Sequence, residues 1–388
     1  MIKKALIALA LLMVLLVPAR VSAASDIKLA GSSTNIDFPT LLTFNVKAES
    51  SSPITRIRLR YQVDKMTYAP SFAEVWMDFP PGKDVSSSWG WDMRKGGLPP
   101  GANVTYWWII EDASGNSITT PRESVQFNDT RYKWQHVTQD MITIYWYQGG
   151  QSFADQLMQA AVAAKARLEA DTGVVLDKPV SIFIYSTYQD LRGSMVAPEE
   201  WTGGVAYAGF NIISIGISTD NLDWGKGAVA HELGHLITHQ VTTSPYAGDL
   251  PPWLDEGLAM HAEAIQSDSD KAELKKAISD GSIATLRSLS SPFSADPKEA
   301  FYDYAESQSV IEYLTSNFSK NKINDLLKQI NNGYSVDEAL QKVYGFDLDG
   351  LDKAWMDWLM AQLQKQSGSA LLRPAAPAFN LNFAAAVS

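Results

Sequence analysis

Three of the chain's five histidines fall within "GKGAVAHELGHLITHQV", residues 225–241. His231 and His235 are four residues apart, so on a helix both project from one face and can bind the same metal ion. Glu232 follows His231 and can reach a water molecule on that ion without binding the ion itself. The spacing therefore predicts a metal centre that does chemistry on water.

A catalytic zinc ion needs three protein ligands and an open position for water. His239 lies eight residues after His231, about 12 Å along a helix axis, so the two cannot share one ion. Glu256 lies in "WLDEGLAMHAEA", after a Pro251–Pro252 corner that can turn the chain back toward the two imidazoles. The residues from which the third ligand is chosen are His239, which this distance excludes, and Asp255, Glu256, His261 and Glu263.

HELGH, followed 21 residues later by the Glu of "WLDEGLA", resembles the gluzincin metallopeptidases, and in particular their aminopeptidase-M1-like branch with its W-x-x-E-G pattern. The resemblance covers roughly residues 131–365. It implies that His231, His235 and Glu256 bind Zn²⁺ and that Glu232 is the general base. Two histidines and a carboxylate with an open position also suit zinc chemically.

The same family places a tyrosine in a later helix, where its hydroxyl stabilises the oxyanion. By resemblance this is Tyr304 in "YAESQSVIEYL", with Tyr302 as the alternative. The strand expected at "NIISIGI" would be the edge strand that pairs with an extended substrate.

Two positions depart from the family. The stretch "GGVAYAGFN" has no carboxylate to recognise a free N-terminus, which favours an endopeptidase over an aminopeptidase. Met260 stands where the thermolysin-like branch has an Asp, so the partner of a ligand histidine is expected elsewhere, at Asp255 or Glu263. We expect the remaining histidines, His136, His239 and His261, to be ordinary hydrogen-bonded residues of the core.

These residues need a helical scaffold, and the second half of the chain predicts one. "MITIYWY" is expected to be the first strand of a domain over residues 131–365, and "KPVSIFIYS" and "FNIISIGIS" are further strands. The segment ending at Gly173 has apolar residues at helical spacing. From residue 225 to 364 the pattern is mostly helical, which together with the resemblance predicts an α+β, thermolysin-like metallopeptidase domain. Residues 366–388 have no periodicity and are expected to be a flexible tail.

The first half has a different pattern. Residues 25–130 contain short alternating segments such as "LLTFNVKAES" and "ITRIRLRYQVD", separated by Gly- and Pro-rich turns, which predicts an antiparallel β-sandwich of immunoglobulin-like type. Its tryptophans are expected to pack mainly in the core, and a carbohydrate-stacking surface is the alternative. They are Trp76, Trp89, Trp91, Trp107 and Trp108.

The N-terminus predicts the cellular compartment, and the composition limits the possible chemistry and partners. Lys3 and Lys4, an apolar run from Ala5 to Val17 and the small residues Val21-Ser22-Ala23 predict a signal peptide over residues 1–23, hence a secreted or periplasmic protein. The run is short for a membrane span, which favours a cleaved signal peptide, and an uncleaved anchor is the alternative. The chain has no cysteine, which excludes disulfides and thiol catalysis. A net charge of −11 argues against nucleic acid as a partner.

The sequence therefore predicts an exported zinc metallopeptidase acting on peptide or protein substrates. Two alternatives stay open. One is a cell-surface or adhesion protein whose β-domain contacts the cell envelope or carbohydrate, with the peptidase half as a latent scaffold. The other is a zinc hydrolase of non-peptide substrates, because the same groups would serve an ester or a small amide.

Overall fold

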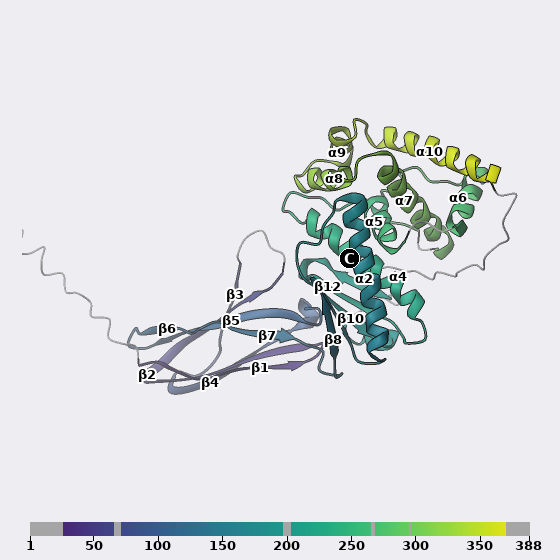
Figure 1. The fold of residues 1–388 in the computed structure, drawn as a ribbon. Coiled ribbons are helices and arrows are strands. Elements are labelled where there is room, and N and C mark those ends of the chain that lie inside the picture. Colours follow the sequence, from purple (N-terminus) through teal and green to yellow (C-terminus); the bar gives the residue numbers. More distant parts are fainter. Residues whose placement is uncertain (1–25, 66–70, 197–202, 265–267, 295, 370–388) are drawn as a thin grey trace, which may run out of the picture.

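The computed structural model describes residues 26–65, 71–196, 203–264, 268–294 and 296–369. Within them, an antiparallel sheet is followed by a second, smaller sheet and a mostly helical region (Figure 1). The predicted signal peptide lies outside the described residues. No helix in the described part of the chain has both the length and the apolar composition needed to cross a bilayer.

The N-terminal sheet is organised around β2, a strand of 23 residues at Leu41–Val63. The first part of β2 pairs with β1 and β4 and the second part with β3 and β5, while β6 and β7 pair with β5. Every pairing is antiparallel. The other strands are β1 (Lys28–Asp37), β3 (Ala73–Trp76), β4 (Gly82–Asp92), β5 (Ala102–Asp112), β6 (Ser117–Thr119) and β7 (Glu123–Phe127), with the short helix η1 at Met93–Lys95.

An immunoglobulin-like sandwich is not confirmed, because all seven strands belong to one continuous sheet. The segments expected as two strands, "LLTFNVKAES" and "ITRIRLRYQVD", form the single strand β2, and this strand joins the two halves. β1 and β4 were not expected. Both are rich in Gly, Ser and Asp, which have low strand propensity, and they depend on pairing with β2.

The tryptophans of this sheet do not all share one environment. Trp107 and Trp108 are buried, as expected, and Trp89 and Trp91 are half-buried and stack near Tyr61. Trp76 on β3 is 61% exposed, so the expectation of core packing is wrong for this residue.

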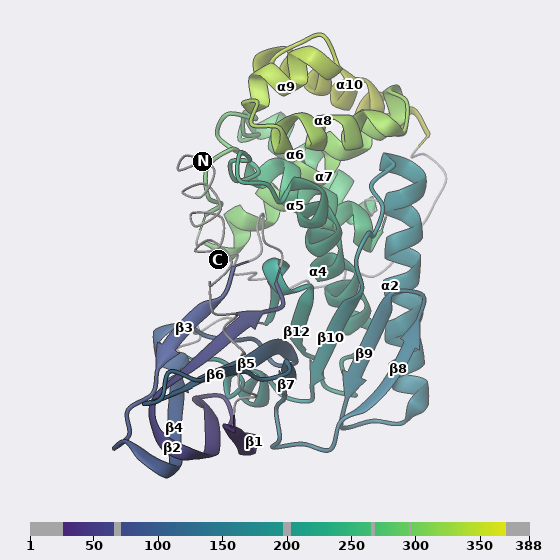
Figure 2. The same ribbon diagram turned by 90° about the vertical axis from the view of Figure 1, so that its left-hand side faces the viewer.

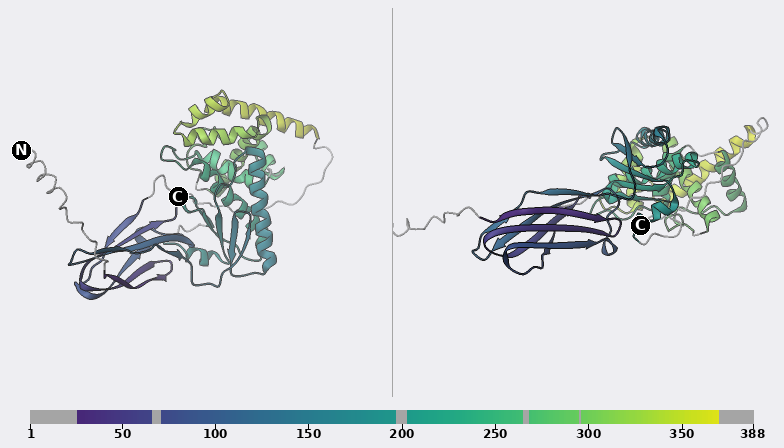
Figure 3. Two further views of the ribbon diagram at one scale, coloured as in Figure 1. Left: turned by 60° about the vertical axis from the view of Figure 1, so that its left-hand side comes forward. Right: turned by 90° about the horizontal axis from the view of Figure 1, so that it is seen from below.

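The second sheet has the order β11-β12-β10-β9-β8 and lies between the helices and the N-terminal sheet (Figures 2 and 3). Along β10, Ile182 and Ile184 pack with the helices, whereas Phe183 and Tyr185 join the core of the N-terminal sheet. β12 and β9 pair with β10 in parallel, and the outer strands β11 and β8 are antiparallel to their neighbours. The strands are β8 (Gln135–Gln139), β9 (Ile142–Trp146), β10 (Val180–Tyr185), β11 (Gly204–Tyr207) and β12 (Ile212–Gly216).

The helical segments predicted from periodicity are present. α2 ends where Gly173 adopts φ +71°, a left-handed conformation that glycine accepts readily. α5 begins at Pro252, where a missing N–H costs nothing. The helices are α2 (Gln151–Thr172), α3 (Tyr188–Arg192), α4 (Leu222–Thr242), α5 (Pro252–Glu263), α6 (Asp268–Asp280), α7 (Pro297–Asn317), α8 (Asn321–Asn331), α9 (Val336–Val343) and α10 (Leu348–Ser369), with the short helix η2 at Ala208–Phe210. α10 continues to Ser369, so the expected tail does not begin at residue 366.

Candidate metal centre

Two closely packed helices position the centre. α4 is buried over most of its length because it carries small and apolar residues on nearly every side. A Cβ at Gly234 would lie 2.9 Å from Cα of Ala259 on α5, so this glycine allows the two backbones to approach closely. That approach brings Glu256 of α5 opposite the histidines of α4.

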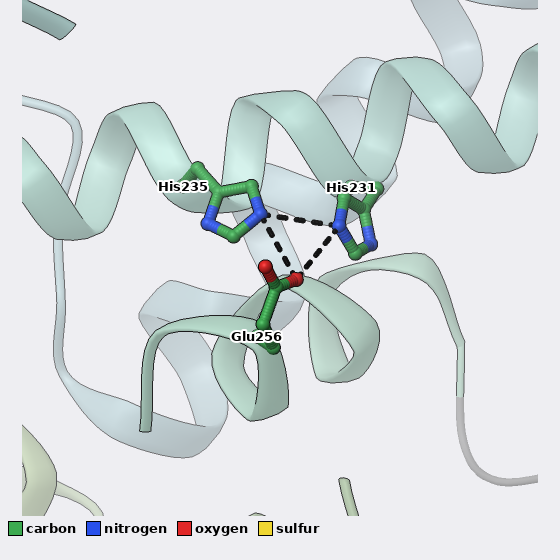
Figure 4. Close-up of side chains that lie close together, drawn as sticks. All are labelled: His231, His235 and Glu256. Atoms are coloured by element: carbon green, nitrogen blue, oxygen red, sulfur yellow. Dashed lines mark hydrogen bonds and ion pairs between the residues drawn. The ribbon is translucent and has the colours of Figure 1, made fainter. Parts of the chain in front are cut away.

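The side chains of His231, His235 and Glu256 point toward one another (Figure 4). The two Nε2 atoms are 3.1 Å apart, and Oε2 of Glu256 lies 3.3 Å from each of them. All three side chains are buried. The structure thus brings together the three residues predicted to bind the metal.

Each histidine has a carboxylate on its other nitrogen. Nδ1 of His231 lies 2.7 Å from Oε1 of Glu263, and Nδ1 of His235 lies 3.0 Å from Oδ1 of Asp255. A carboxylate can only accept, so in each pair Nδ1 carries the proton and donates it. In the neutral tautomer Nε2 is then an acceptor, and both Nε2 atoms face the same point.

The donor set fits zinc. Ligand atoms bound tetrahedrally at zinc distances lie roughly 3.3 Å apart, close to the three separations found here. Oε2 of Glu256 is buried and has no hydrogen-bond donor among the described residues, although ion-pair contacts to both imidazoles remain. Three buried acceptors that converge in this way are unfavourable unless a cation or protons lie between them.

The pKa shifts point the same way. Burial opposes a charge on His231, but Glu256 and Glu263 raise its pKa to about 9. Burial alone would raise the pKa of Glu256, whereas His235 and His231 together lower it to about 2. The surrounding carboxylates therefore favour positive charge at the centre of the cluster.

Glu232 lies between the cluster and the second sheet. It is buried, and burial raises the pKa of its carboxyl. A Cβ at Gly204 would lie 2.8 Å from Oε1 of Glu232, so the carboxylate sits directly against strand β11. A carboxyl group with a raised pKa is suited to accept and return a proton near neutral pH.

Tyr304 reaches the centre from α7. Its ring centroid lies 6.3 Å from that of His231, and the ring also packs edge-on against Phe293, with centroids 5.2 Å apart. Burial raises the pKa of Tyr304, so its hydroxyl stays protonated. Tyr302, two residues earlier, points about 200° away around the helix. Tyr304 is therefore the tyrosine of this pair that faces the cluster.

The other histidines take different roles. Nε2 of His239 lies 3.1 Å from Oδ2 of Asp255, beside the centre. His261 is buried with Nε2 3.0 Å from Asp171, as expected for a core histidine, and burial lowers its pKa. His136 is exposed on β8, so the expectation of a hydrogen-bonded core residue is wrong there.

The edge strand beside the centre is β11, and the expectation that β12 forms this edge is wrong. β12 is paired on both sides, with β10 and with β11. β11 was missed because Gly204–Tyr207 is too short to show a clear alternation. The glycines at 203 and 204 were the available signal, since a strand glycine often marks a close approach.

The family model of the peptidase MA superfamily matches residues 160–361. No curated protein matches the chain in sequence.

Solved structures give distant likenesses. Aminopeptidase A of Legionella pneumophila is 10% identical with a TM-score of 0.35, over 86% of this chain and 50% of that one. The M1 zinc metallopeptidase of Deinococcus radiodurans is 10% identical with a TM-score of 0.28, over 85% and 94%. OgpA of Akkermansia muciniphila is 9% identical with a TM-score of 0.23; the match covers 27% of this chain and only 28% of OgpA.

Proposed function

Because the chain belongs to the peptidase MA superfamily, we propose that it is an exported zinc-dependent peptidase whose zinc ligands are His231, His235 and Glu256. The convergence of two Nε2 atoms and one carboxylate oxygen at separations of 3.1 to 3.3 Å is the observation that carries the proposal. Export rests on the signal peptide predicted over residues 1–23.

The chain's own groups divide the reaction between them. When bound, zinc acidifies water and polarises a carbonyl group. Glu232 accepts the proton of the attacking water and later delivers it to the leaving amine. The Tyr304 hydroxyl donates a hydrogen bond to the oxygen that gains negative charge. Glu263 and Asp255 hold the two imidazoles so that both Nε2 atoms face Oε2 of Glu256.

Metal content by mass spectrometry, measured together with cleavage of an unfolded protein, tests this proposal. The wild type should contain one zinc per chain and cleave the substrate. Glu232→Gln should keep the zinc and lose about 10²–10⁴-fold in turnover, whereas His235→Ala should lose both. His136→Ala, an exposed histidine, is the control. Absence of zinc from the wild type, or normal cleavage by Glu232→Gln, would contradict the mechanism.

We further propose that internal bonds are cleaved in preference to N-terminal ones. Residues 203–211, which include β11, contain no carboxylate to bind a free amino group. A peptide and its N-acetylated form should then be cleaved with similar kcat/KM. A strong preference for the free N-terminus would make the protein an aminopeptidase.

A second candidate function, carbohydrate binding by the N-terminal sheet, is favoured by one exposed surface. Trp76 is 61% and Phe72 52% exposed. Arg58 contacts the ring of Trp76 and Arg60 that of Phe72, and both guanidinium groups also pair with Glu74. Charges that are already paired favour a neutral ligand, and exposed rings are suited to stack on sugar faces. Retention on an insoluble neutral polysaccharide, lost in Trp76→Ala, would support this role; equal retention would exclude it.

A further inference from the structure

Asp255 joins two histidines of α4. It directly precedes Glu256, and its carboxylate is buried. Oδ1 lies 3.0 Å from Nδ1 of His235, and Oδ2 lies 3.1 Å from Nε2 of His239. Both oxygens are therefore engaged, each by a different imidazole, one helical turn apart.

The contact between Asp255 and His239 limits how the Asp255 carboxylate can rotate beside His235. The χ2 torsion of an aspartate is broad, so a carboxylate held at one oxygen can still rotate. With Oδ2 fixed by His239, Oδ1 stays in line with Nδ1 of His235. The orientation of the His235 ring, and with it the direction of Nε2, is then set by two hydrogen bonds.

We propose that His239 is a positioning residue for the metal centre and acts through Asp255 on His235. The inference rests on the proposed zinc site. His239 itself is no ligand of that site: it lies two turns from His231, and its contact is made to the far oxygen of Asp255.

Zinc affinity, measured on the full chain by competition with a chromophoric chelator, tests the proposal without reference to turnover. Loss of a direct partner of a ligand histidine costs about 10–100-fold in affinity. His239→Ala, one step further away, should weaken zinc binding by about tenfold. His239→Gln, which keeps an N–H donor near the position of Nε2, should bind within about threefold of the wild type. His136→Ala should bind as the wild type does.

Whether His239 acts through Asp255 is tested by measuring the effect of His239→Ala on zinc affinity again, in a protein that also carries Asp255→Asn. If His239 acts through Asp255, adding His239→Ala to Asp255→Asn should cause little further loss, whereas independent effects would multiply. Thermal unfolding of the metal-free forms identifies any variant that has failed to fold. If His239→Ala fails to fold, the zinc affinity of His239→Gln is compared with that of the wild type instead.

Three results would overturn the inference. The first is wild-type affinity in His239→Ala. The second is a full tenfold loss in the Asp255→Asn background. The third is two zinc ions in the wild type falling to one in His239→Ala, which would make His235, His239 and Asp255 a second cation site. A wild type that binds no zinc would instead overturn the proposed function itself.

Discussion

At the scale of single residues, the proposed role of the Tyr304 hydroxyl needs its own test, because the sequence left Tyr302 as an alternative. Tyr304→Phe should lower kcat by about 10²–10³-fold, because one donor to the developing oxyanion is lost. Zinc content should not change, since the phenyl ring can keep the contacts with His231 and Phe293. Steady-state kinetics beside metal analysis would measure both.

Tyr302→Phe is the matched control on the same helix. It should leave kcat within about twofold, because Tyr302 points away from the cluster. If Tyr302→Phe is the damaging change and Tyr304→Phe is harmless, the two roles must be exchanged.

Glu306 gives a prediction on pH and stability. It is buried in α7, where Oε2 accepts a hydrogen bond from the amide of Ala284 at 3.0 Å, and burial raises its pKa to about 8. Below pH 4.5, the ordinary pKa of a glutamate, the carboxyl is protonated in both the folded and the unfolded chain. Between pH 4.5 and 8 only the folded chain keeps the proton, so rising pH reduces the free energy of unfolding.

Glu306→Gln removes this dependence while keeping an acceptor for Ala284. The stability of the variant relative to the wild type should increase with pH across that window, by at most about 1.4 kcal/mol per pH unit. Urea unfolding at several pH values would show it. A difference that does not vary with pH would mean that Glu306 is ionised in the folded protein.

At the scale of elements, the site depends on how closely α5 approaches its neighbours. A Cβ at Gly257 would lie 2.6 Å from the carbonyl oxygen of Ser307 on α7. Gly257→Ala should therefore push α5 away, at a cost of about 1–3 kcal/mol that outweighs the helix propensity gained. Because Glu256 is adjacent, zinc affinity should fall as well.

Chemical denaturation and chelator competition would measure both effects. Gly248→Ala, where a Cβ meets nothing within 4 Å, is the control and should change neither quantity. A Gly257→Ala protein that is as stable as the wild type would show that the two helices can move apart at little cost.

The elements also show what the sequence could and could not predict. HELGH and the helices around it were predictable because helical spacing is local: the residues that share a face are three or four positions apart. The partners Asp255 and Glu263 could be named as candidates, but their assignment to particular histidines needed the packing of α5 on α4. β1, β4, β8 and β11 were missed because a strand is stabilised by pairing with distant segments, and weak local propensity then says little.

At the scale of the whole molecule, the two sheets share a core. Phe183 and Tyr185 of β10 pack with residues of the N-terminal sheet. Tyr132 and Tyr147 donate hydrogen bonds to the two oxygens of Asp190, and Tyr185 donates one to Asp129. Removal of the N-terminal sheet would therefore expose Phe183 and Tyr185 of β10.

Unfolding should therefore be a single transition. Phe183→Ala should lower the free energy of unfolding by about 3–5 kcal/mol, because its ring fills the space between the sheets. Tryptophan fluorescence and far-UV circular dichroism should shift together. Phe72→Ala, the same change at an exposed position, is the control. Two separate transitions, with only one of them shifted, would show that the sheets fold independently.

The long strand β2 has a mechanical consequence. Leu41–Val63 forms hydrogen bonds with four other strands, on both of its sides. A force that pulls on the two ends of this strand must shear all of these hydrogen-bonded pairings at once. A force on β6, which among the described strands pairs with β5 alone, can break its hydrogen bonds one after another. The N-terminal sheet should therefore resist a force along β2 more strongly than a force applied to β6.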